Sequence, residues 1–394
     1  MKILHLICYF NDKLDYQENR LIKLQKKNGH DVCLITSDRF YPFKNYENTY
    51  YKTLGKRKIG TKRYNYFGAK IIRKKTYFEF VGRAQCFFFN FFEIIKFSPD
   101  VIHIHNCGIY NFLSSFIYAL IFKKKIFIDC HQDKQNTYEN FFNKFHYFLW
   151  KNIYVIFKKK ISLFLPINEL SKKYLIDFYD VNINKIKISP LGFEKYNRNS
   201  HKFKNNVSEK LIINKKLNEW LIVNSGKQND KKKINALIEL IKILNKKNFS
   251  CKLLLIGNAS SEYDKTLEYK IRTTNLNLGQ NKIVRIDFQK KERLRKFLEL
   301  ADIAIWPGIP SITIQEAIYA NNIVLLPKDS ASSNLITSEY LFFNKDLNQV
   351  ANNIIKIFSN TNLILRIRNK NKKILNNLEW LNINKDLEKY YVGH

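Results

Sequence analysis

The sequence ILHLICYFNDKLDYQENRLIKLQKKNGHDVCLIT, residues 3–36, contains the first complete supersecondary unit of the chain. A β-rich apolar run from Ile3 to Cys8 is followed by a polar loop, an amphipathic run from Tyr16 to Lys27 and a second β-rich run from Val32 to Thr36. Gly29 lies just after the amphipathic run, where glycine ends a helix readily because it adopts the left-handed conformation without a steric cost. The order strand, helix, strand predicts a βαβ unit and therefore a parallel sheet.

The same alternation of short apolar runs and helix-length segments recurs along the chain. Further strands are predicted at residues 101–104, 126–130, 163–167, 186–188, 221–224, 253–256, 283–288, 303–306 and 323–326. Helices are predicted at residues 141–157, 234–247, 292–300 and 313–320, and the segment 347–391 is largely helical by pattern. This alternation predicts an α/β fold with two doubly wound Rossmann-like domains and an inter-domain cleft at the carboxyl ends of their strands.

A chain of 394 residues exceeds the size at which a single core usually keeps growing. We therefore predict two domains with a polar, basic passage between them. The predicted parts are a first domain at 1–195, a linker or crossing at 196–216, a second domain at 217–375 and a terminal helix at 376–394 that packs back on the first domain.

The charge is strongly basic, with 68 Lys and Arg against 34 Asp and Glu and a net charge of +34. Such a charge attracts phosphates, anionic lipid surfaces or nucleic acid. Lys, Asn and Ile are abundant even in loops, so the base composition of a low-GC genome is an equally good explanation of the charge. A nucleic-acid-binding protein is kept as an alternative, but no helix-turn-helix, RRM or zinc module is recognisable and the charge is not concentrated in one segment, so no nucleic-acid partner is expected.

The cysteines are scattered singly without a C-x-x-C pair, which is typical of reduced core thiols in a cytosolic protein. They are Cys8, Cys33, Cys86, Cys107, Cys130 and Cys251. The apolar run at the N-terminus is too short for a signal peptide, and the longest apolar stretch, 112–122, falls short of the roughly 20 residues of a spanning helix. We expect a cytoplasmic protein without a transmembrane segment.

The stretch WPGIPSITIQEA, residues 306–317, carries the most specific signal for a binding site. A strand ends at Trp306, a Pro/Gly turn follows, and Ser311 or Thr313 can cap the next helix, whose free N–H groups would bind an anion. Glu316 could then accept two hydrogen bonds from the vicinal hydroxyls of a ribose. An ordinary capped helix with a glutamate in its first turn is the alternative explanation.

Two further strand ends carry candidate catalytic groups. After residue 224, Ser225-Gly226-Lys227 precedes Lys231-Lys232-Lys233, and the cations Lys227 and Lys232 could neutralise a departing diphosphate. A lysine run is otherwise an ordinary solvated face. In the first domain, Asp129-Cys130-His131-Gln132-Asp133 places His131 where it could donate a proton or orient a hydroxyl group. A histidine that caps a strand end is the alternative there.

No metal is predicted. His103 and His105 alternate on one strand, but no third ligand follows at a suitable spacing. No D-x-D sequence occurs in the chain, so the carboxylate pair that commonly holds a divalent ion on a diphosphate is missing. We therefore expect catalysis without a metal or another cofactor.

These motifs resemble those of family 4 glycosyltransferases. The stretch 306–317 is similar to the family's P-S-x-x-E-x-x-x-x-x-x-x-E-A segment, with Glu316 as the second Glu, which binds the ribose, but with Gly308 where the first Glu would fall. Asn321 stands where a glycine is usual, and asparagine tolerates a left-handed turn. In the family's G-R-x-x-x-x-K-G pattern, Lys227 takes the Arg position and Lys232 the Lys position, while Lys233 replaces the second Gly.

The resemblance implies a GT-B glycosyltransferase that transfers a hexose-type sugar, with retention, from a nucleotide-sugar to a glycan or lipid-linked acceptor in cell-surface polysaccharide or lipopolysaccharide biosynthesis. The predicted donor site consists of Gly226, Lys227, Lys232, Gly308, Ser311, Ile312, Thr313 and Glu316. The predicted catalytic residues are His131, Lys227 and Lys232. Weaker candidates for the acceptor-binding site are Gln17, Glu18 and Asp133. Because the first Glu is absent, a non-catalytic relative that only binds a nucleotide-sugar or glycan is the main alternative.

Basic and aromatic residues interleave in the first domain. The segments are 56–58, 62–63, 73–75, Tyr77, Phe78, Phe80, Phe87–Phe89 and Phe91–Phe92. Such a composition suits contact with an anionic membrane surface, and the resemblance implies a peripheral position on the inner face of the cell membrane. Burial of many of these aromatics in the core is the alternative.

Overall fold

The computed structural model describes residues 1–43, 46–80, 83–85, 90–109, 112–134, 141–196, 207–259, 261–279, 281–309, 311–338 and 341–393. The chain forms two compact units: unit 1 is Met1–Gly192 with Trp380–His394, and unit 2 is Phe193–Glu379. The first segment of unit 1 ends at Gly192, three residues before the boundary predicted at residue 195. Part of the predicted linker is helix α9 (Val207–Ile213) of unit 2. Cys86, Phe87–Phe89, Pro310 and linker residues 197–206 lie outside the described residues.

Unit 1 is built on a seven-stranded sheet in the order β3-β4-β2-β1-β7-β8-β9. The strands are β1 (Lys2–Leu6), β2 (Asp31–Ser37), β3 (Lys62–Tyr66), β4 (Ala69–Lys74), β7 (Val101–Ile104), β8 (Lys125–Cys130) and β9 (Leu163–Pro166). Every pair is parallel except β3 with β4, which form an antiparallel hairpin at the edge. A separate pair, β5 (Phe78–Phe80) and β6 (Arg83–Gln85), is also antiparallel.

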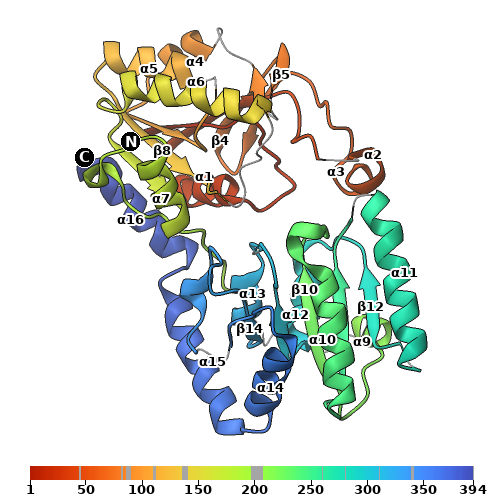
Figure 1. The fold of residues 1–394 in the computed structure, drawn as a ribbon. Helices are drawn as coiled ribbons and strands as arrows, with labels where there is room; N and C mark the ends of the chain where they lie inside the picture. The colour runs from red at the N-terminus through yellow and green to blue at the C-terminus, as the bar shows by residue number, and fades with distance from the viewer. Residues whose placement is uncertain are drawn as a thin grey trace. The chain divides into compact units, whose positions relative to one another are not determined.

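Helices cover both faces of this sheet, as Figure 1 shows. They are α1 (Gln17–Lys27), α2 (Tyr46–Thr49), α3 (Tyr51–Leu54), α4 (Asn90–Phe97), α5 (Phe112–Ile121), α6 (Phe141–Phe157), α7 (Glu169–Asp177), the 3₁₀ turn η1 (Ile183–Lys185) and α16 (Trp380–Gly393). Successive strand residues point to opposite faces. Leu4 and Ile102 therefore join the core beneath α4 to α7, whereas Ile3 and Val101 join the core beneath α1 and α16.

The last helix completes the core of unit 1. Trp380, Ile383, Leu387 and Tyr391 of α16 pack against Ile3, Val101 and Phe127 of the sheet. A Cβ atom on Gly192 would lie 2.6 Å from the Trp380 ring, so no larger residue fits where the chain passes this helix.

Unit 2 has a five-stranded parallel sheet in the order β12-β11-β10-β13-β14. Its strands are β10 (Trp220–Ser225), β11 (Cys251–Ile256), β12 (Ile283–Ile286), β13 (Ile303–Ile305) and β14 (Ile323–Leu325). Its other helices are η2 (Asp230–Lys232), α10 (Ile234–Lys246), α11 (Ser261–Asn277), α12 (Lys291–Leu300), α13 (Ile314–Tyr319), η3 (Ser333–Leu335), α14 (Leu347–Phe358) and α15 (Thr361–Asn376). The strand order reverses between β10 and β13, and doubly wound sheets bind ligands at such a switch point. The corresponding point in unit 1 lies between β1 and β7.

The predicted α/β class with doubly wound sheets is confirmed. The predicted strand 186–188 is wrong, because only Ile186 forms an isolated bridge, to Phe164 of β9. The sequence Ser189-Pro190 follows at once, and proline cannot donate to a sheet. Among the described residues, no helix is long and apolar enough to cross a membrane.

Candidate functional site

The loops after β10 and β13 meet at the switch point of unit 2. Ser225 Oγ and Thr313 Oγ1 share a hydrogen bond of 2.6 Å, and the Trp306 indole donates to the Ser225 carbonyl over 2.8 Å. Asn224 Nδ2 donates to the Ile305 carbonyl over 2.7 Å, which links the two strand ends. These bonds hold backbone and hydroxyl groups of both loops at the carboxyl edge of the sheet.

Two glycines allow these loops to approach closely. Gly226 has φ +125°, and a Cβ there would lie 3.1 Å from Ser311 Oγ. Gly257, directly after β11, has φ +141°, and a Cβ there would lie 2.0 Å from the Gly226 carbonyl oxygen. Neither conformation suits an L side chain. The backbone of Gly226 is therefore left uncovered by any side chain of its own.

The structure gives a physical reason for the glycine at position 308. A Cβ on Gly308 would lie 2.1 Å from the Lys231 carbonyl oxygen and 2.9 Å from the Lys232 carbonyl carbon. The Ile309 N–H donates to the same Lys231 oxygen over 3.1 Å. The segment around η2 therefore occupies the space that a side chain at 308 would need, and the glutamate of the resembling family cannot be accommodated in this conformation.

Lys232 is a partly buried cation beside these loops. Its Nζ donates to the Ile309 carbonyl over 2.8 Å, and its burial lowers the pKa of the ammonium group to about 8. It is therefore still mostly protonated at neutral pH. Lys227, the other predicted cation, is exposed. Lys233 has φ +52° and Asn321 φ +71°, so both non-glycine replacements take the left-handed conformation.

The prediction that the Thr313 side chain can cap the helix of the donor segment is wrong. Its side chain makes no capping bond to α13 but contacts Ser225 and, over 3.0 Å, Ser311 Oγ. The helix itself begins at Ile314 and has only six residues, so it offers little macrodipole for anion binding. Ile312, between the two hydroxyl residues, is exposed.

Glu316 is buried and already engaged in ion pairs. Its Oε2 accepts from Arg295 Nε over 2.9 Å and its Oε1 from Arg295 Nη2 over 3.2 Å. Lys291 Nζ lies 3.2 Å from Oε1. A carboxylate has about four acceptor positions, so two ribose hydroxyls would have to displace the Lys291 contact or share an oxygen with it. The predicted ribose role of Glu316 remains a prediction.

Sequence reasoning missed Arg295 altogether. Its guanidinium group also donates to the Glu194 carbonyl over 3.2 Å and lies 4.2 Å from the centre of the Tyr196 ring. Arg295 thus joins α12 to the segment that enters unit 2. It stands in KKERLRKFLEL among several other basic residues, and nothing in that pattern distinguishes it.

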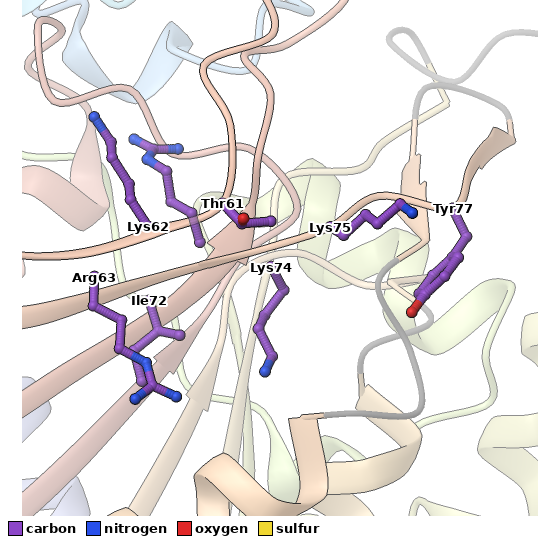
Figure 2. Close-up of a pocket in the computed structure, with 8 residues that line it drawn as sticks. Thr61, Lys62, Arg63, Ile72, Lys74, Lys75 and Tyr77 are labelled. Atoms are coloured by element: carbon purple, nitrogen blue, oxygen red, sulfur yellow. The ribbon is translucent and has the colours of Figure 1, made fainter.

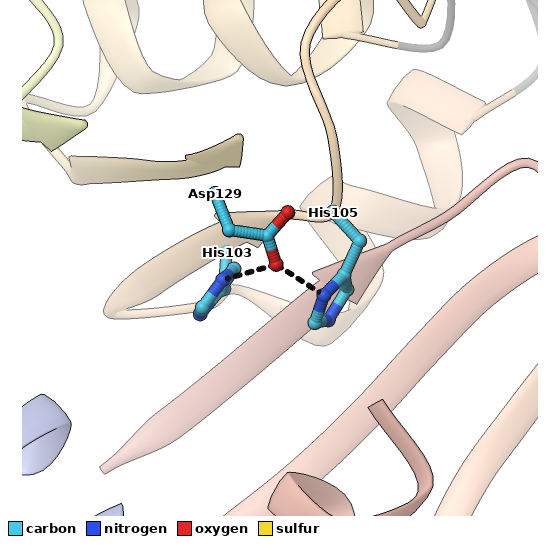
Figure 3. A group of neighbouring side chains, drawn as sticks. All are labelled: His103, His105 and Asp129. Carbon is cyan, nitrogen blue, oxygen red and sulfur yellow. Dashed lines mark hydrogen bonds and ion pairs between the residues drawn. The ribbon is translucent and has the colours of Figure 1, made fainter. Parts of the chain in front are cut away.

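In unit 1, the buried carboxylate of Asp129 on β8 lies between His103 of β7 and His105, which directly follows β7 (Figure 3). Asp129 Oδ2 lies 2.8 Å from His105 Nδ1 and 3.3 Å from His103 Nε2, and its Oδ1 accepts from the Asn106 N–H over 2.6 Å. His131, the predicted catalytic residue, has Nε2 3.5 Å from Asp129 Oδ1, and its side chain is 35% exposed. Asp129 can therefore orient an imidazole that still reaches solvent.

The charges of this network follow from its contacts. Despite its burial, Asp129 has a pKa well below its ordinary value because His105 and His103 stabilise the anion. Burial alone would lower the pKa of His105, but the negative charge of Asp129 outweighs this effect, and the pKa of His105 is raised. Burial lowers the pKa of His103 to about 4 and that of His5 well below its usual range. His5 Nδ1 lies 2.9 Å from His105 Nε2, so we assign it as the acceptor from a protonated His105.

The fold supplies the third possible metal ligand that the sequence spacing did not show. Ligand atoms of His103, His105 and Asp129 lie within 4.8 Å of one another. The two imidazoles are nearly parallel, with ring centres 4.6 Å apart and planes at 15°, so an ion in the plane of one ring lies off the plane of the other. Both rings already contact the Asp129 carboxylate. The argument from spacing was therefore wrong, while the expectation of a metal-free protein remains a prediction.

The weaker acceptor candidates Gln17, Glu18 and Asp133 are all buried. Burial raises the pKa of Glu18 to about 7, and the charge of His105 opposes this shift. Among the described residues, Gln17 Oε1 has no hydrogen-bond partner. Gln17 and Glu18 begin α1, directly after the loop that follows β1, at the switch point of this sheet.

Comparison with known proteins identifies the fold. Over 100% of both chains, the protein is similar to Anabaena HepE in complex with UDP, with 15% identity and a TM-score of 0.70. Sucrose-phosphate synthase from Thermosynechococcus elongatus matches 100% of this chain with 98% of its own, at 13% identity and a TM-score of 0.70. WaaG, a glycosyltransferase involved in lipopolysaccharide biosynthesis, matches over 100% of both chains at 12% identity and a TM-score of 0.61. These likenesses confirm the predicted GT-B fold.

A family model then identifies the second unit. Residues 206–374 match the model described as Glycosyl transferases group 1. The matched segment coincides with most of unit 2, and the predicted enzyme class, a glycosyltransferase, is confirmed. No curated protein matches the chain.

Proposed function

We propose that the protein is a family 4 type glycosyltransferase that binds a nucleotide-sugar at the switch point of unit 2. The observation that carries the proposal is the junction of the loops after β10 and β13. There glycine at 226 lets the two loops approach closely, Ser225 and Thr313 present hydroxyl groups, and Lys232 stands within reach of the same loops. A diphosphate needs hydrogen-bond donors together with a cation, and the two hydroxyl groups and Lys232 provide both.

The reaction we propose breaks the bond between the anomeric carbon and the diphosphate oxygen. The acceptor hydroxyl forms the new bond to that carbon and loses its proton, while the nucleoside diphosphate leaves with an additional negative charge. Lys232 would stabilise this charge, as a fixed cation beside a leaving group lowers the barrier. We propose retention of configuration on the resemblance to family 4, and catalysis without a metal on the absence of a D-x-D pair.

Unit 1 supports the acceptor side of the proposal. His131, oriented by Asp129, is the group that would contact the acceptor hydroxyl or the transferred sugar. Glu18, with a pKa raised to about 7 by burial, could accept a proton near neutral pH. We propose a glycan or lipid-linked acceptor in cell-surface polysaccharide or lipopolysaccharide biosynthesis, met at the inner face of the cell membrane. The likeness to WaaG supports this choice.

Transfer assays with UDP-, GDP- and dTDP-sugars test the proposal. The protein is incubated with each labelled donor and a membrane extract, and labelled product and free nucleoside diphosphate are measured. We expect one donor class to be consumed and His131→Ala to lower turnover by about 100-fold or more without a matching loss of donor binding. Donor binding with no transfer to any acceptor would favour the non-catalytic alternative, and no response to any nucleotide would refute the proposal.

A further inference from the structure

The outer surface of helices α4, α5 and α6 in unit 1 is unusually apolar. Large apolar side chains that are more than a third exposed gather there. They are Phe92 and Ile95 of α4, Ile117, Leu120 and Ile121 of α5 with the following Phe122, and Phe141, Phe142, Phe145, Phe148, Leu149, Val155 and Ile156 of α6. Monomeric soluble proteins rarely expose so many large apolar groups together, and such patches mark interaction surfaces.

Helix α6 shows that this exposure follows a pattern. His146, Trp150 and Tyr154 form its buried stripe. At 100° per residue, the exposed apolar side chains cover an arc of roughly 140° on the opposite side of the helix. Lys144 and Lys151 lie seven residues apart along one flank of that arc, and Lys158, directly after the helix, continues the row and pairs with Asp180. The outer face of α6 therefore has the division into an apolar band and a basic edge that is typical of helices lying in a membrane interface.

The three helices present these side chains in one direction. Ile94 of α4, Phe116 of α5 and Trp150 of α6 belong to a single core on one face of the sheet. Their outer surfaces therefore all point away from that face, as the arrangement of α4, α5 and α6 in Figure 1 shows. Neither α5 nor α6 contains an acidic residue, and lysine runs at 123–125 and 158–160 follow them. The whole layer is apolar and basic.

A basic cavity of about 380 Å³ lies beside this layer (Figure 2). It is lined by Thr61, Lys62, Arg63, Ile72, Arg73, Lys74, Lys75 and Tyr77. Arg63 and Lys74 form ion pairs with Glu93 of α4, whose neighbour Phe92 is 72% exposed. The cavity and the apolar layer are therefore connected through α4, and anionic headgroups would find the exposed Lys62 and Lys75 of the cavity wall near the apolar side chains.

Part of the membrane surface expected from the sequence is wrong. Arg73 is buried and donates inward to the carbonyls of Ser37 and Phe10 over 3.2 and 3.1 Å. Arg57 is paired with Glu79. Tyr77, Phe78 and Phe92 are exposed as expected, but the larger part of the apolar surface lies on α5 and α6, which that interpretation did not include.

We propose that the outer face of α4, α5 and α6 docks on an anionic phospholipid bilayer. The apolar side chains would enter the boundary between headgroups and acyl chains, and the flanking lysines and the basic cavity would contact lipid phosphates. A bilayer fits this face better than a second copy of the chain, because a net charge of +34 on each copy and the lysine row on α6 oppose association of like surfaces. This proposal rests on the proposed function, because the bilayer is proposed as the membrane partner of that glycosyltransferase.

Vesicle flotation of the full chain tests the docking. The vesicles are phosphatidylcholine, alone or with phosphatidylglycerol at about one part in three. We expect binding that requires phosphatidylglycerol, weakens with salt and falls at least about tenfold in Phe145→Ser/Phe148→Ser/Ile156→Ser, because each change removes apolar area from the lipid contact. The matched control is Leu217→Ser/Tyr269→Ser/Leu276→Ser, which alters apolar residues of unit 2 that are more exposed than the three replaced in α6 and should bind like the wild type.

Three outcomes would overturn the docking proposal. The first is unchanged vesicle binding by the α6 variant, and the second is loss of binding in both variants. The third is a wild-type dimer in light scattering that becomes a monomer in the α6 variant, which would assign the surface to a second copy. Nucleotide-induced thermal shifts, measured in parallel, separate this proposal from the enzymatic one. Vesicle binding without any nucleotide response would refute only the proposed function, and the reverse would refute only the docking.

Discussion

Replacement of Lys232 by methionine should weaken donor binding and remove its dependence on pH. In the structure the ammonium group donates to the Ile309 carbonyl, and burial lowers its pKa to about 8. An ammonium has three N–H donors and can hold that carbonyl together with a phosphate oxygen. A hydrogen bond to a charged group contributes about 2 kcal/mol, so Lys232→Met should weaken UDP-glucose binding roughly 30-fold at pH 7.

The pH profile makes this prediction specific. Because the pKa of free Lys232 is about 8, roughly one ammonium in ten remains protonated at pH 9, so wild-type affinity should fall about tenfold between pH 7 and pH 9. The charge of a nucleotide-sugar diphosphate is constant over this range. Titration calorimetry at both pH values measures the fall, and Lys227→Met, which changes an exposed lysine, should retain it. The same pH profile in Lys232→Met and in the wild type would refute the role of this lysine.

Three further predictions concern Gly308 and two buried ionisable residues, Glu18 and Arg295. Gly308→Ala should lower the free energy of unfolding by about 1–3 kcal/mol, because its Cβ would meet the Lys231 carbonyl oxygen at 2.1 Å. Urea unfolding measures this loss, with Gly393→Ala as the control, because a Cβ at position 393 meets nothing within 4 Å. Equal stability of the two variants would contradict the prediction. The stability of Glu18→Gln relative to the wild type should rise by about 3 kcal/mol between pH 4.5 and pH 7.5. Burial raises the pKa of Glu18 in the folded state to about 7 from 4.5, so the wild type loses stability as pH rises through this range. If urea unfolding shows a constant difference in stability between the two proteins, Glu18 is not a buried, neutral group. Arg295→Met should destabilise unit 2 by about 3 kcal/mol, because it leaves the buried Glu316 without its bidentate partner, and a melting temperature equal to that of the wild type would show that Lys291 alone suffices.

The βαβ alternation and most strands were predictable because a buried parallel strand is a short apolar run with turn residues at its ends. Helix 141–157 and strand 101–104 were predicted with the bounds found. The hairpin of β3 and β4 was missed, since its alternating basic residues resemble a solvated surface and its pairing is antiparallel. The outward apolar face of α6 was also missed, because a helix with large apolar side chains on two opposite faces looks from its sequence like a buried one.

Candidate site residues could be predicted from the sequence only where a single segment contains them. Glu316, Lys232 and His131 lie in segments that follow strands, and this position together with the resemblance to family 4 singled them out as candidates. The His103, His105 and Asp129 network depends on the register of neighbouring strands, which pairs His103 with Phe127 and so brings Asp129 to the level of His105. Arg295 reaches Glu316 from another helix. Contacts of this kind depend on how distant elements pack, and no local pattern contains that information.

Hydrogen–deuterium exchange of the full chain with and without nucleotide-sugars tests whether the donor binds at the switch point of unit 2. We expect the effective donor to slow exchange in the segments 225–233 and 307–316, because the ligand would cover the loops after β10 and β13. We also expect Lys232→Met to abolish this protection at the same donor concentration. Protection confined to unit 1, or none with any UDP-, GDP- or dTDP-sugar, would contradict a donor site at the switch point of unit 2.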